Sequence, residues 1–185
     1  AVTPADGTVL FDSIGIGDGL SPYASMQGTS MAAPVVTGAV AVLAGQHPDD
    51  SAARLAARLK GAVQRDDRYA ELCSTSGHVS VDGGQDPAPV PTSAEVSADG
   101  GSIVVSGYFV DPGTQVLVEG VACSETAREE LPGSDGVTQI TVQVPEGFVG
   151  GEQWVELIAP DGASGRLYAD FGTYALLDYY EQTDL

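Results

Sequence analysis

The sequence predicts two regions of different fold class, an α/β region over residues 1–85 and an all-β sandwich over residues 93–173. Three observations predict this division. Two runs of helical length, one free of charge and one amphipathic, lie before residue 64. Residues 86–92, D-P-A-P-V-P-T, are typical of an extended Pro-rich linker. After this linker, apolar and polar residues alternate with the period of two that strands show.

Residues 1–27 have the composition of loops and a short strand, T-V-L-F-D at residues 8–12. The next run, M-A-A-P-V-V-T-G-A-V-A-V-L-A-G-Q, carries no charge and is apolar on every side. Such a pattern is typical of a buried helix. Pro34 falls in or near its first turn, where the missing N–H costs least, and His47 with Pro48 ends it.

A second helix is predicted over residues 51–63, S-A-A-R-L-A-A-R-L-K-G-A-V. Its leucines and valine recur every four residues, which indicates an amphipathic surface helix. Residues Asp49, Asp50 and Ser51 are its N-cap candidates. The basic residues of this helix, Arg54, Arg58 and Lys60, predict a solvated face. A short strand between turns is expected over residues 73–84.

Five strands are predicted in the second region, at residues 103–110, 114–120, 137–144, 152–158 and 164–171, with a shorter one near Glu95. Asp111 to Thr114, D-P-G-T, places Pro and Gly as a type II turn requires. Short strands at this spacing are typical of an Ig-like β-sandwich. Residues 174–185 form a separate apolar and aromatic tail. The aromatic residues Trp154, Tyr108 and Phe109 are expected in the core, with a binding patch as the alternative.

The net charge is −19, from 26 acidic and 7 basic residues, and most of the acidic excess lies after residue 85. This charge excludes a nucleic-acid-binding role, which requires a basic face. We expect no apolar run long enough to span a membrane. The chain opens A-V-T-P-A-D-G, without Met or a charged leader, which predicts a fragment or a processed product. The cysteines, Cys73 and Cys123, have no metal-binding spacing and are expected as buried thiols or as a disulfide.

The run G-T-S-M-A-A-P, Gly28 to Pro34, places Ser30 at the start of the first predicted helix. Unpaired N–H groups and the helix dipole at such a position favour developing negative charge. A serine also needs a base to become a nucleophile. From spacing alone, a helix cap is the favoured interpretation of Ser30, because a serine before a helix is common.

The seven-residue string and the V-T-G-A-V-A that follows closely resemble the serine motif of the subtilisin-like peptidases, or subtilases. Further likeness lies in P-A-D-G at residues 4–7, in H-P-D-D with the helix after it, and in G-H-V-S-V-D-G near residue 80. The resemblance covers residues 1–85. It implies the C-terminal part of a three-layer α/β catalytic domain.

The resemblance implies that Ser30 is the acylating nucleophile, that its own N–H is one oxyanion donor, and that the motif is supported by Gly28, Thr29, Met31, Ala32 and Pro34. The implied triad has the chain order Asp, His, Ser, with an Asn as second oxyanion donor. No His or Asn precedes Ser30, and His47 and His78 both follow it. The missing groups are therefore expected from sequence upstream, the N-terminal part of the catalytic domain. Val35 departs from the family, which usually has His there.

Residues 92–172 resemble the IPT/TIG type of Ig-like domain, on S-G-Y-F, P-G-T-Q-V and a closing P-D-G. Together the two resemblances predict a secreted or cell-surface serine endopeptidase that acts on peptides or proteins, and a chain that is inactive by itself. The alternative is an inert subtilase-like surface protein whose acidic Ig-like domain is a spacer or binding module. No cofactor is expected to be required; calcium is possible, but no ligand loop can be named.

Overall fold

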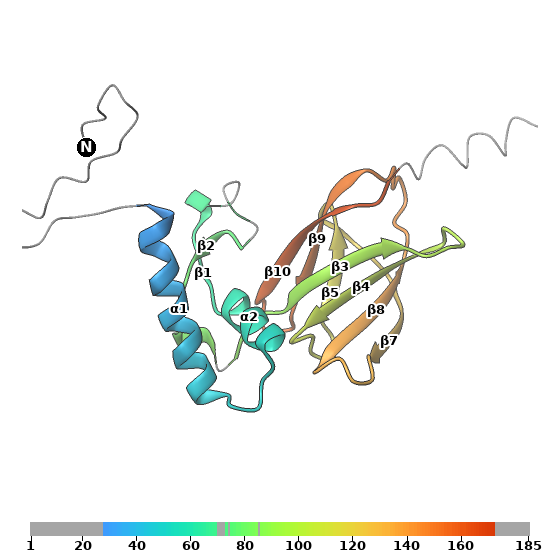
Figure 1. Cartoon of the computed structure of the whole chain (residues 1–185). Coiled ribbons are helices and arrows are strands. Elements are labelled where there is room, and N and C mark those ends of the chain that lie inside the picture. The colour runs from blue at the N-terminus through green and yellow to red at the C-terminus, as the bar shows by residue number, and fades with distance from the viewer. Residues whose placement is uncertain (1–27, 70–72, 74, 85, 173–185) are drawn as a thin grey trace, which may run out of the picture. The chain divides into compact units, whose positions relative to one another are not determined.

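The computed structural model describes residues 28–172, apart from residues 70–72, 74 and 85. Its contacts divide the chain into two compact units, Ala1–Val35 and Val36–Leu185. The predicted N-terminal strand and P-A-D-G element, together with the tail at residues 174–185, lie outside the described residues. The fold combines helices with antiparallel sheets, as the sequence predicts (Figure 1).

Both predicted helices are present. Helix α1 spans Thr29–Gln46 and α2 spans Ala52–Gly61. Ser51 is the N-cap of α2, and its hydroxyl accepts a hydrogen bond from the Arg54 N–H at 3.2 Å. The expected burial of α1 is wrong, because only Ala39 and Leu43 of its described residues are buried. An apolar helix is covered only if the chain supplies a surface for it, which composition alone does not reveal.

Short elements follow the helices in the second unit. They are β1 (Gln64–Arg65), the 3₁₀ helix η1 (Asp67–Tyr69), β2 (Gly77–His78) and the 3₁₀ helix η2 (Asp82–Gly84). Strand β2 pairs antiparallel with β1. The strand expected over residues 73–84 is therefore reduced to two residues.

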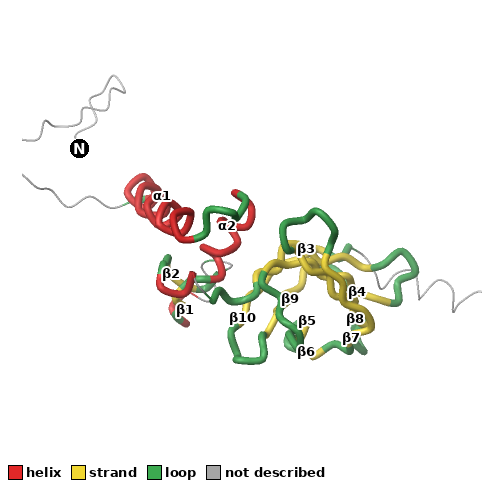
Figure 2. The backbone as a smooth tube through the Cα atoms, turned by 90° about the horizontal axis from the view of Figure 1, so that it is seen from below, coloured by secondary structure: helices red, strands yellow, loops and turns green. Residues whose placement is uncertain are grey.

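The remaining strands form two antiparallel sheets of four strands each. One has the order β3-β4-β8-β7, with bounds Val90–Val96, Ser102–Tyr108, Val137–Gln143 and Glu125–Glu130. The other has the order β10-β9-β5-β6, with bounds Ser164–Asp170, Glu152–Ile158, Gln115–Val118 and Val121–Ala122. Figure 2 shows the strands of these two sheets gathered together, and α2 contacts β3.

One apolar core lies between the two sheets, and we call residues 90–170 the two-sheet region. Alternate residues of the central strands β4, β8, β9 and β5 enter this core, as the period of two requires. Val105 on β4 and Val142 on β8 come from one sheet, and Val155 and Leu157 on β9 from the other. All four are at most 1% exposed, so the two-sheet region buries a continuous core of its own.

The Pro-rich stretch is shorter than predicted, because Val90, Pro91 and Thr92 already belong to β3. Pro91 is tolerated there since β3 is an edge strand, and its ladder shifts register between Pro91 and Ser93. Pro89 and Pro91 are both buried, so this part is packed rather than solvated. The domain boundaries at residues 85 and 93 stay a prediction.

Two strands were not predicted. Strand β7 has the sequence E-T-A-R-E-E and lacks an apolar face, so no alternation marks it. It is an edge strand held by backbone pairing to β8, and its charges suit an exposed edge. Strand β6 is only two residues long. The predicted D-P-G-T turn is present, with Gly113 at φ +88° and the Thr114 N–H bonded to the Asp111 carbonyl at 3.0 Å.

The three aromatic residues have different surroundings. Tyr108 is buried and Phe109 partly buried in a small cluster with Ala57 of α2. Trp154 is half-buried, and its ring centroid lies 4.9 Å from that of Tyr168, which is 49% exposed. Core packing is therefore correct for Tyr108 but wrong for Trp154.

Both cysteines are free thiols in the structure. Cys73 is exposed rather than buried, and Cys123 is half-buried.

Candidate active site

Ser30 is the second residue of α1 and is exposed. The helix starts on the carbonyl of Gly28, which accepts hydrogen bonds from the N–H groups of Met31 at 3.0 Å and Ala32 at 3.2 Å. Gly28 has φ +148°, a conformation that residues with a side chain rarely adopt. A glycine before the serine thus lets the chain enter the helix sharply and leaves open space beside it.

The other residues of the motif are largely exposed around Ser30. Thr29, Ala32 and Pro34 are exposed, and Met31 is half-buried. The N–H of Ser30 belongs to the first helical turn, whose N–H groups have no acceptor within the helix itself. With the helix dipole, such a group can stabilise an oxyanion formed at the serine. Hydroxyl and donor therefore come from the same residue.

Pro34 is the sixth residue of α1, in the turn that follows the first one. The regular helical bond from residue 34 would run to the carbonyl of Ser30, four residues earlier. Proline has no N–H to make it. The serine consequently lies on a turn with one fewer backbone hydrogen bond.

Neither histidine lies beside Ser30 along the helix. His47 follows the last residue of α1, at the other end of this 18-residue helix, and its N–H bonds to the Leu43 carbonyl at 2.8 Å. His78 is on β2, where its Nε2 lies 3.1 Å from Oε1 of Gln64. Within the described part of the chain, no hydrogen bond joins a histidine or carboxylate to Ser30. Among the described residues, the start of α1 therefore offers an exposed serine hydroxyl beside N–H groups of the first helical turn.

The exposed apolar side chains of α1 are the most unusual feature near this serine. Val35 is 60% exposed and Val42 47%, and Val36 is also exposed. Full burial of one valine is worth roughly 1.5 kcal/mol or more. These valines therefore form an exposed apolar surface on α1 in the described structure.

The same helix meets the length and composition of a membrane span, against the expectation that no apolar run would. The buried core helix of a water-soluble domain meets these criteria equally. Length and composition therefore do not assign α1 to a membrane.

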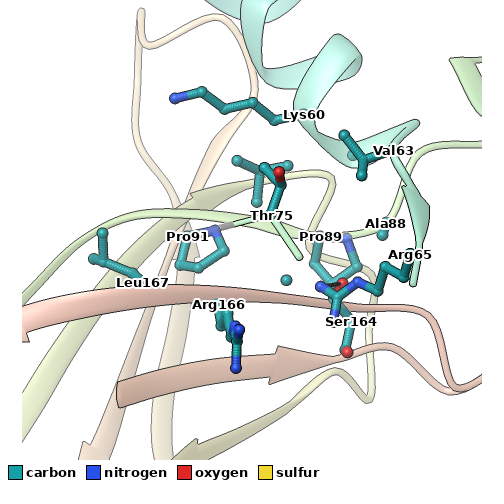
Figure 3. Close-up of a pocket in the computed structure, with 13 residues that line it drawn as sticks. Lys60, Val63, Arg65, Thr75, Ala88, Pro89, Pro91, Ser164, Arg166 and Leu167 are labelled. Carbon is teal, nitrogen blue, oxygen red and sulfur yellow. Dashed lines mark hydrogen bonds between the residues drawn. The ribbon is translucent and has the colours of Figure 1, made fainter. Parts of the chain in front are cut away.

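A narrow crevice of about 90 Å³ lies in the second unit between the end of α2 and strands β3 and β10 (Figure 3). Val63, Pro89 and Pro91 line it, together with the stems of basic side chains. Figure 3 shows the amine of Lys60 pointing away from it and Arg65 reaching Ser164, whose carbonyl accepts its hydrogen bond. Burial lowers the pKa of Arg65. The crevice holds a few water molecules at most, and its charged groups do not converge as an anion site requires.

Among the described residues, no group of three or more His, Cys, Asp or Glu side chains could hold a metal ion. The possibility of calcium stays a prediction. The candidate site thus rests on Ser30 and the start of α1.

Comparison with protein-family models gives one match. Residues 10–87 match the model of the subtilase family. This match supports a subtilase-like domain in that part of the chain, and at the family level it points to a subtilisin-like serine peptidase. Searches among curated proteins and among solved structures gave no match. The subtilase-like region includes α1, α2 and the short elements up to η2.

Proposed function

We propose that the chain is part of a serine endopeptidase of the subtilisin type, with Ser30 as its nucleophile. The observation that carries this proposal is the position of Ser30 in the motif G-T-S-M-A-A-P, at the exposed start of an apolar helix, inside a region that matches the subtilase family. The proposed substrates are peptides or proteins.

In the proposed reaction the Oγ of Ser30 attacks the carbonyl carbon of the substrate while a histidine takes the hydroxyl proton. The N–H of Ser30 donates to the oxyanion. Collapse of the tetrahedral intermediate breaks the C–N bond, and the histidine returns its proton to the leaving amine. Water then attacks the ester on Ser30 by the same route and releases the acid.

The histidine, the aspartate that orients it and the Asn of the oxyanion hole come from sequence upstream of this chain. The uncovered valines of α1 support this, since the N-terminal part of a catalytic domain would provide the layer that they lack. The present chain by itself is therefore inactive, and its first partner is that N-terminal part, either in the same parent protein or as a separate chain.

The two-sheet region is proposed to be an Ig-like domain of the IPT/TIG type, and the protein to be secreted or displayed at the cell surface. Two antiparallel sheets around one core support the first proposal. Fold gives no ligand for such a domain.

A second candidate is an inert subtilase-like surface protein that acts through its acidic two-sheet region. Val35 at the position where the family usually has His favours it. The two candidates differ in what Ser30 does, and one substitution separates them.

The test is Ser30→Ala in the parent protein, assayed for hydrolysis of a broad peptide substrate. We expect a loss of at least about a thousandfold in kcat/KM, with an unchanged circular dichroism spectrum. Ser80→Ala, in the same region but away from α1, is the matched control and should keep full activity. Equal hydrolysis by the parent protein and its Ser30→Ala variant would leave the inert surface protein as the better account.

A further inference from the structure

Left-handed backbone conformations occur where the two-sheet region contacts the elements before it, at three of four such residues; the fourth, Glu119, lies in the turn between β5 and β6. Four described residues other than glycine have a left-handed φ: Ser76, Phe109, Glu119 and Asp135. The ring of Phe109 contacts α2, Asp135 bonds to α2, and Ser76 accepts a hydrogen bond from Arg166 of β10. A bulky residue such as Phe109, at φ +56°, is an outlier there. Such strained backbone conformations persist where the surrounding structure fixes them, and they are common at functional sites.

We call Phe109 and Asp135 the docking face. Phe109 follows β4 directly, and its ring centroid lies 4.9 Å from the guanidinium of Arg58 and 5.2 Å from that of Arg54. These distances are those of cation–π contacts. Both arginines also bond to Asp50, with Nε–oxygen distances of 3.1 Å from Arg54 and 2.8 Å from Arg58. Their aromatic and acidic partners thus hold the two cations between the end of α1 and the two-sheet region.

Asp135 lies in the loop between β7 and β8, at φ +58°. Its carboxylate accepts the N–H of Ser51, the N-cap of α2, at 3.1 Å, and its carbonyl accepts Arg54 Nη1 at 2.6 Å. The hydrogen bond from Ser51 lowers the pKa of Asp135. A Cβ on the next residue, Gly136, would overlap the Arg54 guanidinium. The loop between β7 and β8 therefore supplies acceptors to the first turn of α2 from outside that helix.

The contact continues to the serine-motif helix. Arg58 is 6% exposed, and its Nη1 donates to the carbonyl of Gly84 at 2.7 Å. Gly84 packs against Leu43 of α1 so closely that a Cβ at residue 84 would overlap the leucine side chain. Leu43 is 0% exposed and is one of the two buried residues of α1. A chain of direct contacts therefore joins Phe109 to Arg58, Gly84 and Leu43.

We propose that the two-sheet region is an intramolecular clamp, whose docking face holds α2 and, through Gly84, the C-terminal half of α1 in a fixed position. Charge complementarity supports this partner. Five of the seven basic residues lie between Arg54 and Arg68, whereas residues 86–185 hold most of the acidic excess. This proposal goes beyond peptidase activity and does not depend on it. A spacer on a flexible linker would leave α1 unaffected by changes in Phe109.

The experiment is amide hydrogen exchange on the 185-residue chain carrying Phe109→Ala. This residue lies outside the subtilase-like region and touches α2 but not α1. We expect exchange in residues 43–47 and 52–61 to become at least about tenfold faster. Tyr168→Ala is the matched control, since it removes an aromatic ring from the same two-sheet region on a face that packs on Trp154. It should leave those two segments unchanged.

A second pair guards against a variant that fails to fold. Asp135→Ala removes the outside cap of α2, and Asp161→Ala removes a comparable exposed turn aspartate, whose carboxylate accepts the Ala163 N–H. Of these two variants, only Asp135→Ala should speed amide exchange in residues 43–47. Unchanged exchange there in Phe109→Ala and in Asp135→Ala, or an equal increase in the matched controls, would overturn the clamp.

Discussion

The burial of the two helices is the opposite of what their sequences predict. Helix α1 has no charged residue, yet Val35 is 60% exposed, while α2 is rich in arginine, yet Arg58 is 6% exposed. The difference lies in where each helix finds its partner. The partner of α2 is the docking face within the same chain. The layer that α1 needs is the N-terminal part of the catalytic domain in the account proposed above.

The largest expected effect comes from placing a charge on the uncovered face of α1. In the parent protein, Val42→Asp should abolish assembly of the catalytic domain and its activity, because an unpaired carboxylate would be buried. In the present chain the same change should alter the free energy of unfolding by less than about 0.5 kcal/mol, since Val42 is 47% exposed. Urea unfolding of the chain and a peptidase assay of the parent measure the two outcomes.

Leu43→Asp is the control for this comparison, because Leu43 is buried within the chain itself. It should destabilise chain and parent alike. If Val42→Asp destabilises the isolated chain as strongly as Leu43→Asp, α1 already has its partner within the chain.

A medium effect is expected at the buried end of α2. Arg58→Met removes the more buried of the two arginine partners of Asp50, whose side chain is only 14% exposed, and leaves the Gly84 carbonyl without its side-chain donor. Breaking a buried ion pair from one side costs about 3 kcal/mol. Arg68→Met, in a side chain that is 80% exposed, should cost less than about 0.5 kcal/mol. Equal unfolding midpoints in urea for these two variants would contradict the burial of Arg58.

The smallest effect is expected from pH. The pKa of Asp135 is lowered in the folded chain by its hydrogen bond from Ser51. Its contribution is therefore fully present above the unfolded pKa of about 3.9 and is lost as pH falls through the lower folded value. Unfolding by urea between pH 5 and 2.5 should show a shallower acid loss in Asp135→Asn than in the unchanged chain. Identical acid profiles would show that the cap carries no charge-dependent stability.

The sequence predicted α1 from an uncharged apolar run and α2 from its amphipathic period, and it predicted six of the eight strands of the two-sheet region from alternation and turn signals. Strand β7 was missed since most of its residues are charged, and its place depends on backbone pairing with β8 and on hydrogen bonds from Arg128 to the distant carbonyls of Asp111 and Thr114. The solvated face predicted for Arg54 and Arg58 was wrong for Arg58. Its surroundings depend on Phe109 and Gly84, more than 20 residues away, and no local pattern reports them. The one feature of the sequence that could have indicated these contacts is the cluster of basic residues between Arg54 and Arg68 in an otherwise acidic chain.

For the site itself, the sequence motif located Ser30 and its helix, and the structure adds that the serine is exposed and that the helix is uncovered. Neither could be read from periodicity, since an apolar pattern is the same whether or not its partner is present.

The most direct test of the central claim is labelling of Ser30 by a fluorophosphonate probe, read by peptide mass spectrometry. The account predicts little labelling of the purified chain and strong labelling once the upstream part of the parent protein is added, with none in Ser30→Ala under either condition. Strong labelling of Ser30 in the isolated chain would contradict the account, because the base would then have to lie within these 185 residues.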